Sequence, residues 1–306
     1  MADISTKADS ILLFKDSWGI ELEDIDISDI SQLVIEIKNS VISQARSFNL
    51  INCDQGIKLI DHSNIIINSS AFENVGNTDV VNGGTILSSD SNITIEQSDF
   101  RYCKAKQGGC LALLCSKDIR CESRIHSTKF YNSIAEVKGG AIYYDLYRPT
   151  LNNISFSNNS AQYGNDIASY PIQIKLKGSD SDYIILQNVV SGQIHSPAPE
   201  FELVDHDRQI ILTDNTSTIR IKSMNQNTTV AGTLTVVTNM GGSTFNELIL
   251  TAKPGSKNIE FEVISTAIDN DKLDLQYNGT HTQHMIDASF RYCQSGEIEI
   301  NDQCQV

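Results

Sequence analysis

The sequence contains no apolar run of about 18 residues, the length that a membrane-spanning helix needs. Basic residues are scarce, since 23 Lys and Arg stand against 38 Asp and Glu and the formal net charge is −15. A surface with this charge repels the phosphates of nucleic acids and of anionic lipids. We therefore expect no membrane segment within the chain and no nucleic-acid partner.

Recognisable catalytic, metal-binding and cofactor-binding motifs are missing as well. Residues 269–274 bring several oxygen ligands together but lack the glycine and the final glutamate of a calcium loop. His281 and His284 form an HxxH pair for which no third ligand is in view. The acidic run over residues 21–29 is more typical of a solvated strand edge than of a binding site. The sequence thus predicts no catalytic residue, no metal site and no cofactor.

An internal repeat is the most informative feature that is present. Five phenylalanines recur at intervals of 24, 28, 30 and 26 residues: Phe48, Phe72, Phe100, Phe130 and Phe156. Each is followed after 8 to 11 residues by a glycine, which is doubled in three of the five repeats. This period, with short alternating strands and no helical pattern, predicts the coils of a parallel β-helix. We expect the β-helix over residues 1–195, with its clearest repeats over residues 45–172 and the five phenylalanines in one interior ladder.

Two of the repeats carry a resemblance to a known family. Gly139-Gly140-Ala141-Ile142 and Phe156-Ser157-Asn158-Asn159 resemble the GGA[I/L/V] and FxxN motifs of bacterial polymorphic outer-membrane proteins, which also occur in large surface proteins of ciliates. The resemblance implies a right-handed parallel β-helix, similar to the pectin-lyase architecture, that is displayed outside the cell.

The phenylalanine and glycine repeat does not continue into the second half of the chain. Ser196-Pro197-Ala198-Pro199 predicts a short stiff linker. Beyond it, strands alternate with turns about every ten residues, which favours an antiparallel β-sandwich-like domain over residues 196–288. The alternative, that these strands continue the β-helix irregularly, stays open. Residues 289–306 resemble the start of a growth-factor-receptor-type Cys-rich region.

Seven cysteines are a moderate number, but four of them lie within residues 103–121 with no His nearby at metal-ligand spacing, and this density favours disulfides in an oxidising compartment. Six are disulfide candidates: Cys103, Cys110, Cys115, Cys121, Cys293 and Cys304. Cys53 is expected to remain free in an alanine-sized interior slot, because it stands five positions after Phe48, where the later repeats have Ala105, Ala135 and Ala161. The sequence does not fix the connectivity, and reduced, buried cysteines remain the alternative.

Seven N-glycosylation sequons support secretion as a second observation. They lie at Asn68, Asn92, Asn153, Asn158, Asn215, Asn227 and Asn278. The first residues lack the basic and apolar regions of a signal peptide, so we expect an ectodomain piece of a longer secreted or membrane protein.

The function that these features favour is a non-catalytic recognition or adhesion module at the cell surface or outside the cell. Its expected partners are a protein or glycan at a cell surface and other domains of the same parent protein. Insertions between solenoid repeats often carry binding residues. The residues expected to bind therefore lie in two inserted loops: Asn77, Asp79, Lys117, Asp118 and Arg120.

A carbohydrate-active β-helix enzyme, or a degenerate glycan-binding descendant of one, is the alternative function. The fragments at residues 77–79 and 220–222 resemble parts of polygalacturonase sites, but the Asp-Asp pair and the Gly-His-Gly segment expected between them are missing. A concave face with carboxylates within roughly 5–9 Å of each other would favour this alternative.

Overall fold

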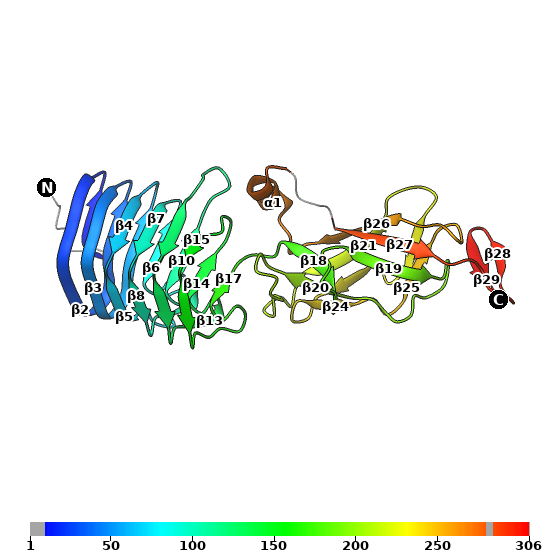
Figure 1. The fold of residues 1–306 in the computed structure, drawn as a ribbon, viewed down its shortest axis with the longest axis horizontal. Helices are drawn as coiled ribbons and strands as arrows, with labels where there is room; N and C mark the ends of the chain where they lie inside the picture. Colours follow the sequence, from blue (N-terminus) through cyan, green and yellow to red (C-terminus); the bar gives the residue numbers. More distant parts are fainter. Residues whose placement is uncertain (1–9, 280–283, 306) are drawn as a thin grey trace. The chain divides into compact units, whose positions relative to one another are not determined.

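The computed structural model describes residues 10–279 and 284–305. It divides the chain into two compact units, Met1–Tyr170 and Pro171–Val306. Strands make up nearly all the regular structure of the described residues, and the one helix among them is α1 (Asn270–Tyr277). This confirms the predicted all-β class (Figure 1).

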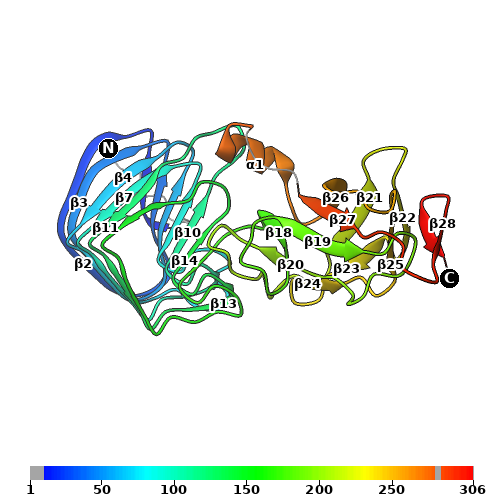
Figure 2. The ribbon, with the colours of Figure 1, turned by 45° about the vertical axis from the view of Figure 1, so that its right-hand side comes forward.

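The first unit is a parallel β-solenoid of about six turns. It begins with β1 (Ser10–Lys15) and with two long strands, β2 (Trp18–Lys38) and β3 (Val41–Ile60), which continue around several faces of the coil (Figures 1 and 2).

Later coils divide into shorter strands that stack in parallel. One stack holds β4 (Asn64–Asn68), β7 (Asn92–Glu96), β11 (Ser123–His126) and β15 (Thr150–Asn152). A second holds β5 (Ala71–Val75), β8 (Asp99–Arg101), β12 (Lys129–Tyr131) and β16 (Ser155–Ser157). A third holds β6 (Ile86–Ser89), β10 (Leu111–Leu114), β14 (Ile142–Tyr144) and β17 (Ile167–Ala168). β9 (Lys104–Gln107) pairs with β13 (Ile134–Lys138).

The second unit is built mainly from antiparallel sheets, as the sequence predicts for this part of the chain. One sheet has the order β18 (Gln173–Leu176), β20 (Glu200–Val204), β24 (Gly242–Thr244). The largest has the order β19 (Ile184–Val189), β27 (Met285–Phe290), β26 (Ile259–Ser265), β21 (Thr218–Ser223), β23 (Thr235–Val237), in which β19 and β27 alone run parallel. Two further pairs are β22 (Thr229–Gly232) with β25 (Leu248–Thr251) and β28 (Ile298–Ile300) with β29 (Gln303–Gln305).

The boundary between the units lies at Tyr170–Pro171 and not at residue 195. β18 pairs with β20 and β19 pairs with β27, so both strands belong to the second unit. Their alternating sequences suit a strand in either fold, and the long-range partner decides between them. The terminal segment also belongs to this unit, because Cys304 N donates to Ser191 O at 3.0 Å.

A ladder of phenylalanines fills the solenoid interior. Phe72, Phe100, Phe130 and Phe156 pair in register, with successive ring centroids 4.6, 4.9 and 5.5 Å apart. Leu50 takes the equivalent position in the preceding coil. Phe48 lies two residues earlier, in register with Ile25, although it is also fully buried and its ring lies 6.5 Å from Phe72. Four of the five predicted members therefore share one ladder position.

Buried hydroxyls connect one coil to the next at the corners. Ser17 N donates to Ser40 Oγ at 3.0 Å, Ser40 N to Ser63 Oγ at 3.2 Å, and Ser63 N to Ser91 Oγ at 3.1 Å. A second series of the same kind uses the hydroxyls of Ser70, Ser98 and Thr128. A buried N–H group without a partner is costly, so each hydroxyl satisfies a group that the bend removes from the strand ladder.

The two positions of a doubled glycine need glycine for different reasons. Gly108 has a φ of +61°, a conformation that side chains with a Cβ rarely adopt. Gly109 lies so close to the next coil that a Cβ atom there would overlap the carbonyl oxygen of Gly140. The first glycine makes the turn and the second allows the coils to approach.

Four of the six candidate cysteines form disulfides, which link Cys115 to Cys121 and Cys293 to Cys304. Cys103 and Cys110, the two remaining disulfide candidates, are not linked to each other or to another cysteine. They are buried free thiols, like Cys53.

These thiols occupy interior positions of the solenoid. Cys53 is free, as predicted, but its register partners are Ile30 and Val75. The predicted reason, an interior position that it shares with alanines of the later coils, is therefore wrong. Cys110 Sγ lies 3.0 Å from Ser133 Oγ, and burial raises the pKa of the Cys110 thiol well above its usual value. A protonated buried thiol is unreactive.

The interior ladder predicts the effect of shortening one of its members. Phe130→Ala should lower the free energy of unfolding of the first unit by roughly 3–5 kcal/mol, because Phe130 is fully buried between two other rings. Denaturant unfolding measures this change. Phe156→Ala should cost less, since Phe156 is only partly buried. Equal losses for the two variants would contradict the ladder.

The cysteine assignment predicts three reactive thiols per chain after denaturation without reductant: Cys53, Cys103 and Cys110. Mass spectrometry after alkylation gives the count, and Cys53→Ser should reduce it to two. A single modified cysteine in the wild-type chain would show instead that Cys103 and Cys110 are linked.

An ion pair in the turn between β27 and β28 predicts a pH effect. The Arg291 guanidinium donates to both oxygens of Glu297 at 2.7 Å, Gln294 N also donates to this carboxylate, and together they lower the pKa of Glu297 to about 2. Because this pKa lies below the ordinary value of 4.5, the pair stabilises the folded turn over residues 291–297 fully above pH 4.5. That stabilisation is lost as the pH falls towards 2.

Carboxyl-resolved NMR titration measures the pKa of Glu297. Arg291→Gln should move its midpoint up towards 4.5. A midpoint already near 4.5 in the wild-type chain would contradict the ion pair.

Candidate recognition site

The first predicted loop lies between β5 and β6. Asn77 Oδ1 accepts from Asp79 N at 2.9 Å and from Val80 N at 3.3 Å, so the Asn77 side chain shapes the turn. Asn77 also lines a surface hollow of about 340 Å³, together with Asn52 and Lys104. Asp79 is exposed and does not line this hollow.

The second predicted loop, between β10 and β11, carries Lys117, Asp118 and Arg120, all of them exposed. The Cys115–Cys121 disulfide closes it, and Ser116 N donates to Asp90. The first loop leads into the start of β6, whereas the second follows the end of β10, which stacks on β6 in parallel. The two loops therefore lie at opposite ends of this stack and do not form one site.

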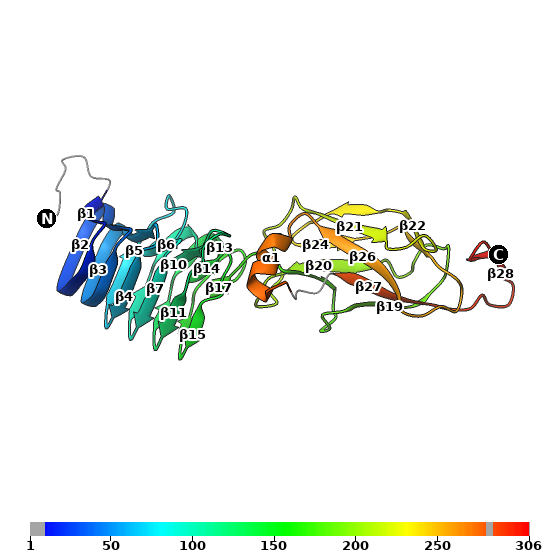
Figure 3. The same cartoon turned by 90° about the horizontal axis from the view of Figure 1, so that it is seen from above.

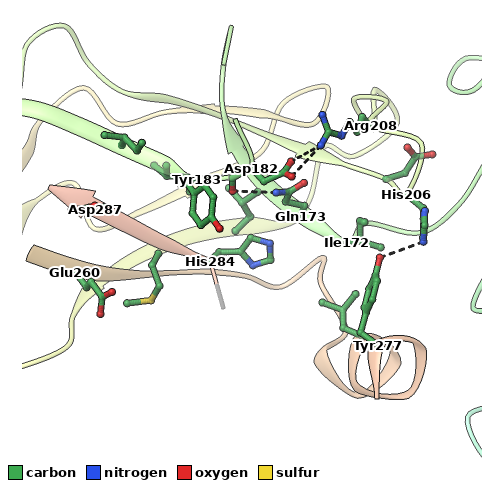
Figure 4. A pocket seen from close by; sticks show the side chains of 16 residues that line it. Ile172, Gln173, Asp182, Tyr183, His206, Arg208, Glu260, Tyr277, His284 and Asp287 are labelled. Carbon is green, nitrogen blue, oxygen red and sulfur yellow. Dashed lines mark hydrogen bonds and ion pairs between the residues drawn. The ribbon is translucent and has the colours of Figure 1, made fainter. Parts of the chain in front are cut away.

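A cavity of about 650 Å³ in the second unit is a site that the sequence does not predict (Figure 4). Segments that are far apart in the sequence form it: β18, the residues before β19, the turn after β20, β26, α1 and the start of β27. Its polar and aromatic lining consists of Gln173, Asp182, Tyr183, Asp205, His206, Arg208, Glu260, Tyr277, His284 and Asp287.

One wall of the cavity consists of polar groups that hold each other in place. Arg208 Nη2 donates to the two carboxylate oxygens of Asp182 at 3.1 and 3.0 Å. The turn that carries Arg208 is fixed by Asp205, whose carboxylate accepts from two backbone N–H groups at 2.9 Å each. Such a wall presents hydrogen-bonding groups in fixed directions.

An aromatic pair continues this wall towards α1. Tyr277 Oη lies 3.3 Å from His206 Nε2, and the two rings stack with centroids 6.2 Å apart. Burial raises the pKa of the Tyr277 phenol. The side chain of Asp269 caps α1, accepting from Lys272 N, so this acidic segment positions Tyr277 at the end of the helix.

Tyr183 is the most accessible aromatic residue of the cavity, with 69% of its surface exposed. His284 lines the same cavity (Figure 4). Ser181 Oγ accepts from Tyr183 N at 3.0 Å, and Gln173 Nε2 donates to the neighbouring Asp182 O at 3.2 Å. The backbone that carries Tyr183 is thus held on both sides, while the ring remains open to a ligand.

Two acidic residues lie opposite each other on the adjacent strands β26 and β27. Glu260 and Asp287 pair directly in the antiparallel register, which places their Cβ atoms about 5 Å apart. Asp287 Oδ1 is a buried atom without a hydrogen-bond partner among the described residues. Like charges in this arrangement repel, so the pair favours a ligand that brings donors or positive charge.

The other residues singled out from the sequence have identifiable structural positions. His284 lines the cavity, whereas His281 lies outside the described residues. The fragments at residues 77–79 and 220–222 belong to different units, and Lys222 forms an ion pair with Glu262 at 2.6 Å.

The sequons fall into two groups. Exposed side chains belong to Asn153, Asn158, Asn215, Asn227 and Asn278. Asn68 and Asn92 are half-buried, and their side chains bond to Glu96 and to Glu122 N of the next coil. A glycan on either of the latter two would break a contact between coils.

Comparisons with known proteins identify no relative of the chain. No family model matches the chain, and no curated protein is significantly similar to it. Among the described residues, no helix has the length and apolar character needed to cross a membrane.

Proposed function

We propose that the chain is a non-catalytic recognition or adhesion module of an extracellular or cell-surface protein. The cavity of the second unit carries this proposal. It combines an open aromatic ring at Tyr183 with polar groups that are already fixed, such as the Arg208–Asp182 pair. A pocket with an apolar surface and a few oriented polar groups is the usual form of a ligand site.

A glycan or a protein side chain with an apolar face and polar edges suits this geometry. The Tyr183 ring can pack against the apolar face, while Arg208, Asp182 and Gln173 hydrogen-bond to the edges. The solenoid supports a display role, because its stacked coils form a core that does not depend on the exterior loops.

The extracellular assignment draws support from covalent chemistry. The Cys115–Cys121 and Cys293–Cys304 disulfides are typical of oxidising compartments. Five of the seven sequons present an exposed asparagine. The resemblance of residues 139–142 and 156–159 to surface-protein repeats, and of residues 289–306 to a Cys-rich repeat, points in the same direction.

A carbohydrate-active enzyme is the second candidate, and the Glu260–Asp287 pair favours it. Retaining glycosidases use a pair of neighbouring carboxyl groups, and Glu260 and Asp287 lie directly opposite each other on adjacent strands at the edge of the cavity.

Binding measurements on wild-type protein and Tyr183→Ala test the proposed function. The probes are a printed panel of neutral and acidic oligosaccharides and intact cells. We expect wild type to bind a member of the panel or the cells, and Tyr183→Ala to bind at least about fivefold more weakly, since a stacked aromatic ring contributes about 1 kcal/mol or more.

Tyr292→Ala is the matched control, because Tyr292 is 77% exposed in the same unit and does not line the cavity. Equal losses for both variants, or no binding by wild type, would contradict the proposal. Cleavage of a glycan by wild type that is abolished in Asp287→Asn would establish the second candidate instead.

A further inference from the structure

Two turns of the second unit carry exposed apolar side chains. The first turn covers residues 212–217 and precedes β21, and the second covers residues 238–241 and precedes β24 (Figure 3). Leu212 on the first turn is 41% exposed, and Met240 on the second is 56% exposed. Both side chains therefore offer apolar surface to a molecule outside the fold.

Backbone contacts hold the two turns against each other. Gly241 N donates to Asp214 O at 2.8 Å. A Cβ atom on Gly241 would lie only 2.7 Å from the carbonyl oxygen of Ile211. Leu212 and Met240 are the next residues along the chain from this contact, so their side chains start from neighbouring points of the surface.

Met240 adopts a backbone conformation that is costly for its residue type. Its φ of +50° lies in the left-handed region, which at turns is usually occupied by Gly, Asn or Asp. The exposed methionine side chain gains little burial that could offset this strain. A strained residue that displays an apolar side chain indicates a role beyond the local fold.

The glycosylation sequon at Asn215 lies between the two apolar side chains. Asn215 is exposed, and its Oδ1 accepts from Met240 N at 2.8 Å, which fixes the orientation of the amide. Its Nδ2 lies 3.5 Å from Thr213 O, on the side of the turn that carries Leu212. Nδ2 is the atom to which an N-linked glycan is attached. A glycan leaves the amide oxygen and one amide hydrogen in place, so both contacts persist after attachment.

We infer that Asn215 carries an N-linked glycan whose first sugars pack on Leu212 and Met240. The glycan is transferred from a lipid-diphosphate-linked oligosaccharide. The bond between the anomeric carbon and the diphosphate breaks, a bond from that carbon to Asn215 Nδ2 forms, Nδ2 gives up one proton, and the lipid diphosphate leaves. The apolar faces of the sugar rings then remove Leu212 and Met240 from water.

This inference rests on the extracellular location in the proposed function and adds a structural role for one glycan. Asn227 is another exposed sequon residue of the second unit. Its side chain has no hydrogen bond among the described residues, so nothing there directs a glycan onto a particular surface. The amide of Asn215, in contrast, is held in one direction by Met240 N.

Secretion of the full-length chain from cultured animal cells, behind an added signal peptide, tests the inference. Mass spectrometry of glycopeptides gives the occupancy of Asn215. Hydrogen peroxide then oxidises the Met240 thioether to the sulfoxide with release of water, at a rate that follows the exposure of the sulfur. We expect Asn215 to be occupied and Met240 to be oxidised about threefold more slowly in wild type than in Thr216→Ala.

Thr216→Ala is the matched variant, because it removes the sequon and keeps the Asn215 side chain with its bond to Met240 N. Asn227→Gln removes a different exposed sequon of the same unit and should leave the oxidation rate of Met240 unchanged. Met224, which is 47% exposed, is the internal reference and should be oxidised equally fast in wild type and in Thr216→Ala.

An unoccupied Asn215, or equal oxidation rates of Met240 in wild type and Thr216→Ala, would overturn the inference. Protection of Met240 in Thr216→Ala that rises with protein concentration would assign the apolar pair to a second copy of the chain and overturn it as well. These outcomes are independent of ligand binding at Tyr183, so they are distinguishable from a failure of the proposed recognition function.

Discussion

The first unit depends on one constraint: a coil of the solenoid cannot bury its own apolar residues and must use those of its neighbours. Phe72, Phe100 and Phe130 are fully buried because each lies between equivalent residues of adjacent coils. The corners obey the same rule, since Ser63 Oγ accepts from Ser40 N of the coil before it. Register is therefore fixed twice, by apolar stacking along the faces and by hydrogen bonds at the bends.

This constraint explains which parts of the fold the sequence predicts. A repeated residue at a regular interval indicates stacking directly, so the phenylalanines and doubled glycines predict the solenoid. The hydroxyl ladders carry a weaker signal of the same kind, a Ser or Thr two residues before Phe72, Phe100 and Phe130. The register of the early coils escapes prediction, because Leu50 replaces phenylalanine in the ladder while Phe48 lies two positions away.

The second unit shows why its site could not be predicted. Its sheets join strands far apart in the sequence, as in the pairing of β19 with β27, and no repeated residue marks those partners. The cavity brings Tyr183 together with Tyr277 and His284, about a hundred residues later. His284 is singled out in the sequence only as part of an HxxH pair, and the local sequences of Tyr183 and Tyr277 carry no motif. The sequence did not predict that Cys103 and Cys110 remain free for a related reason. Spacing along the chain does not show which interior position a side chain occupies.

Stacking also determines what is left over at the start of the solenoid. Every interior coil covers its neighbours on both sides, whereas residues 18–32 of β2 have a neighbouring strand on one side among the described residues. An exposed edge of this kind promotes unspecific pairing, and charged side chains are a common means of preventing it. The carboxylates of Glu21, Glu23 and Asp26 have this effect against neutral and acidic strands.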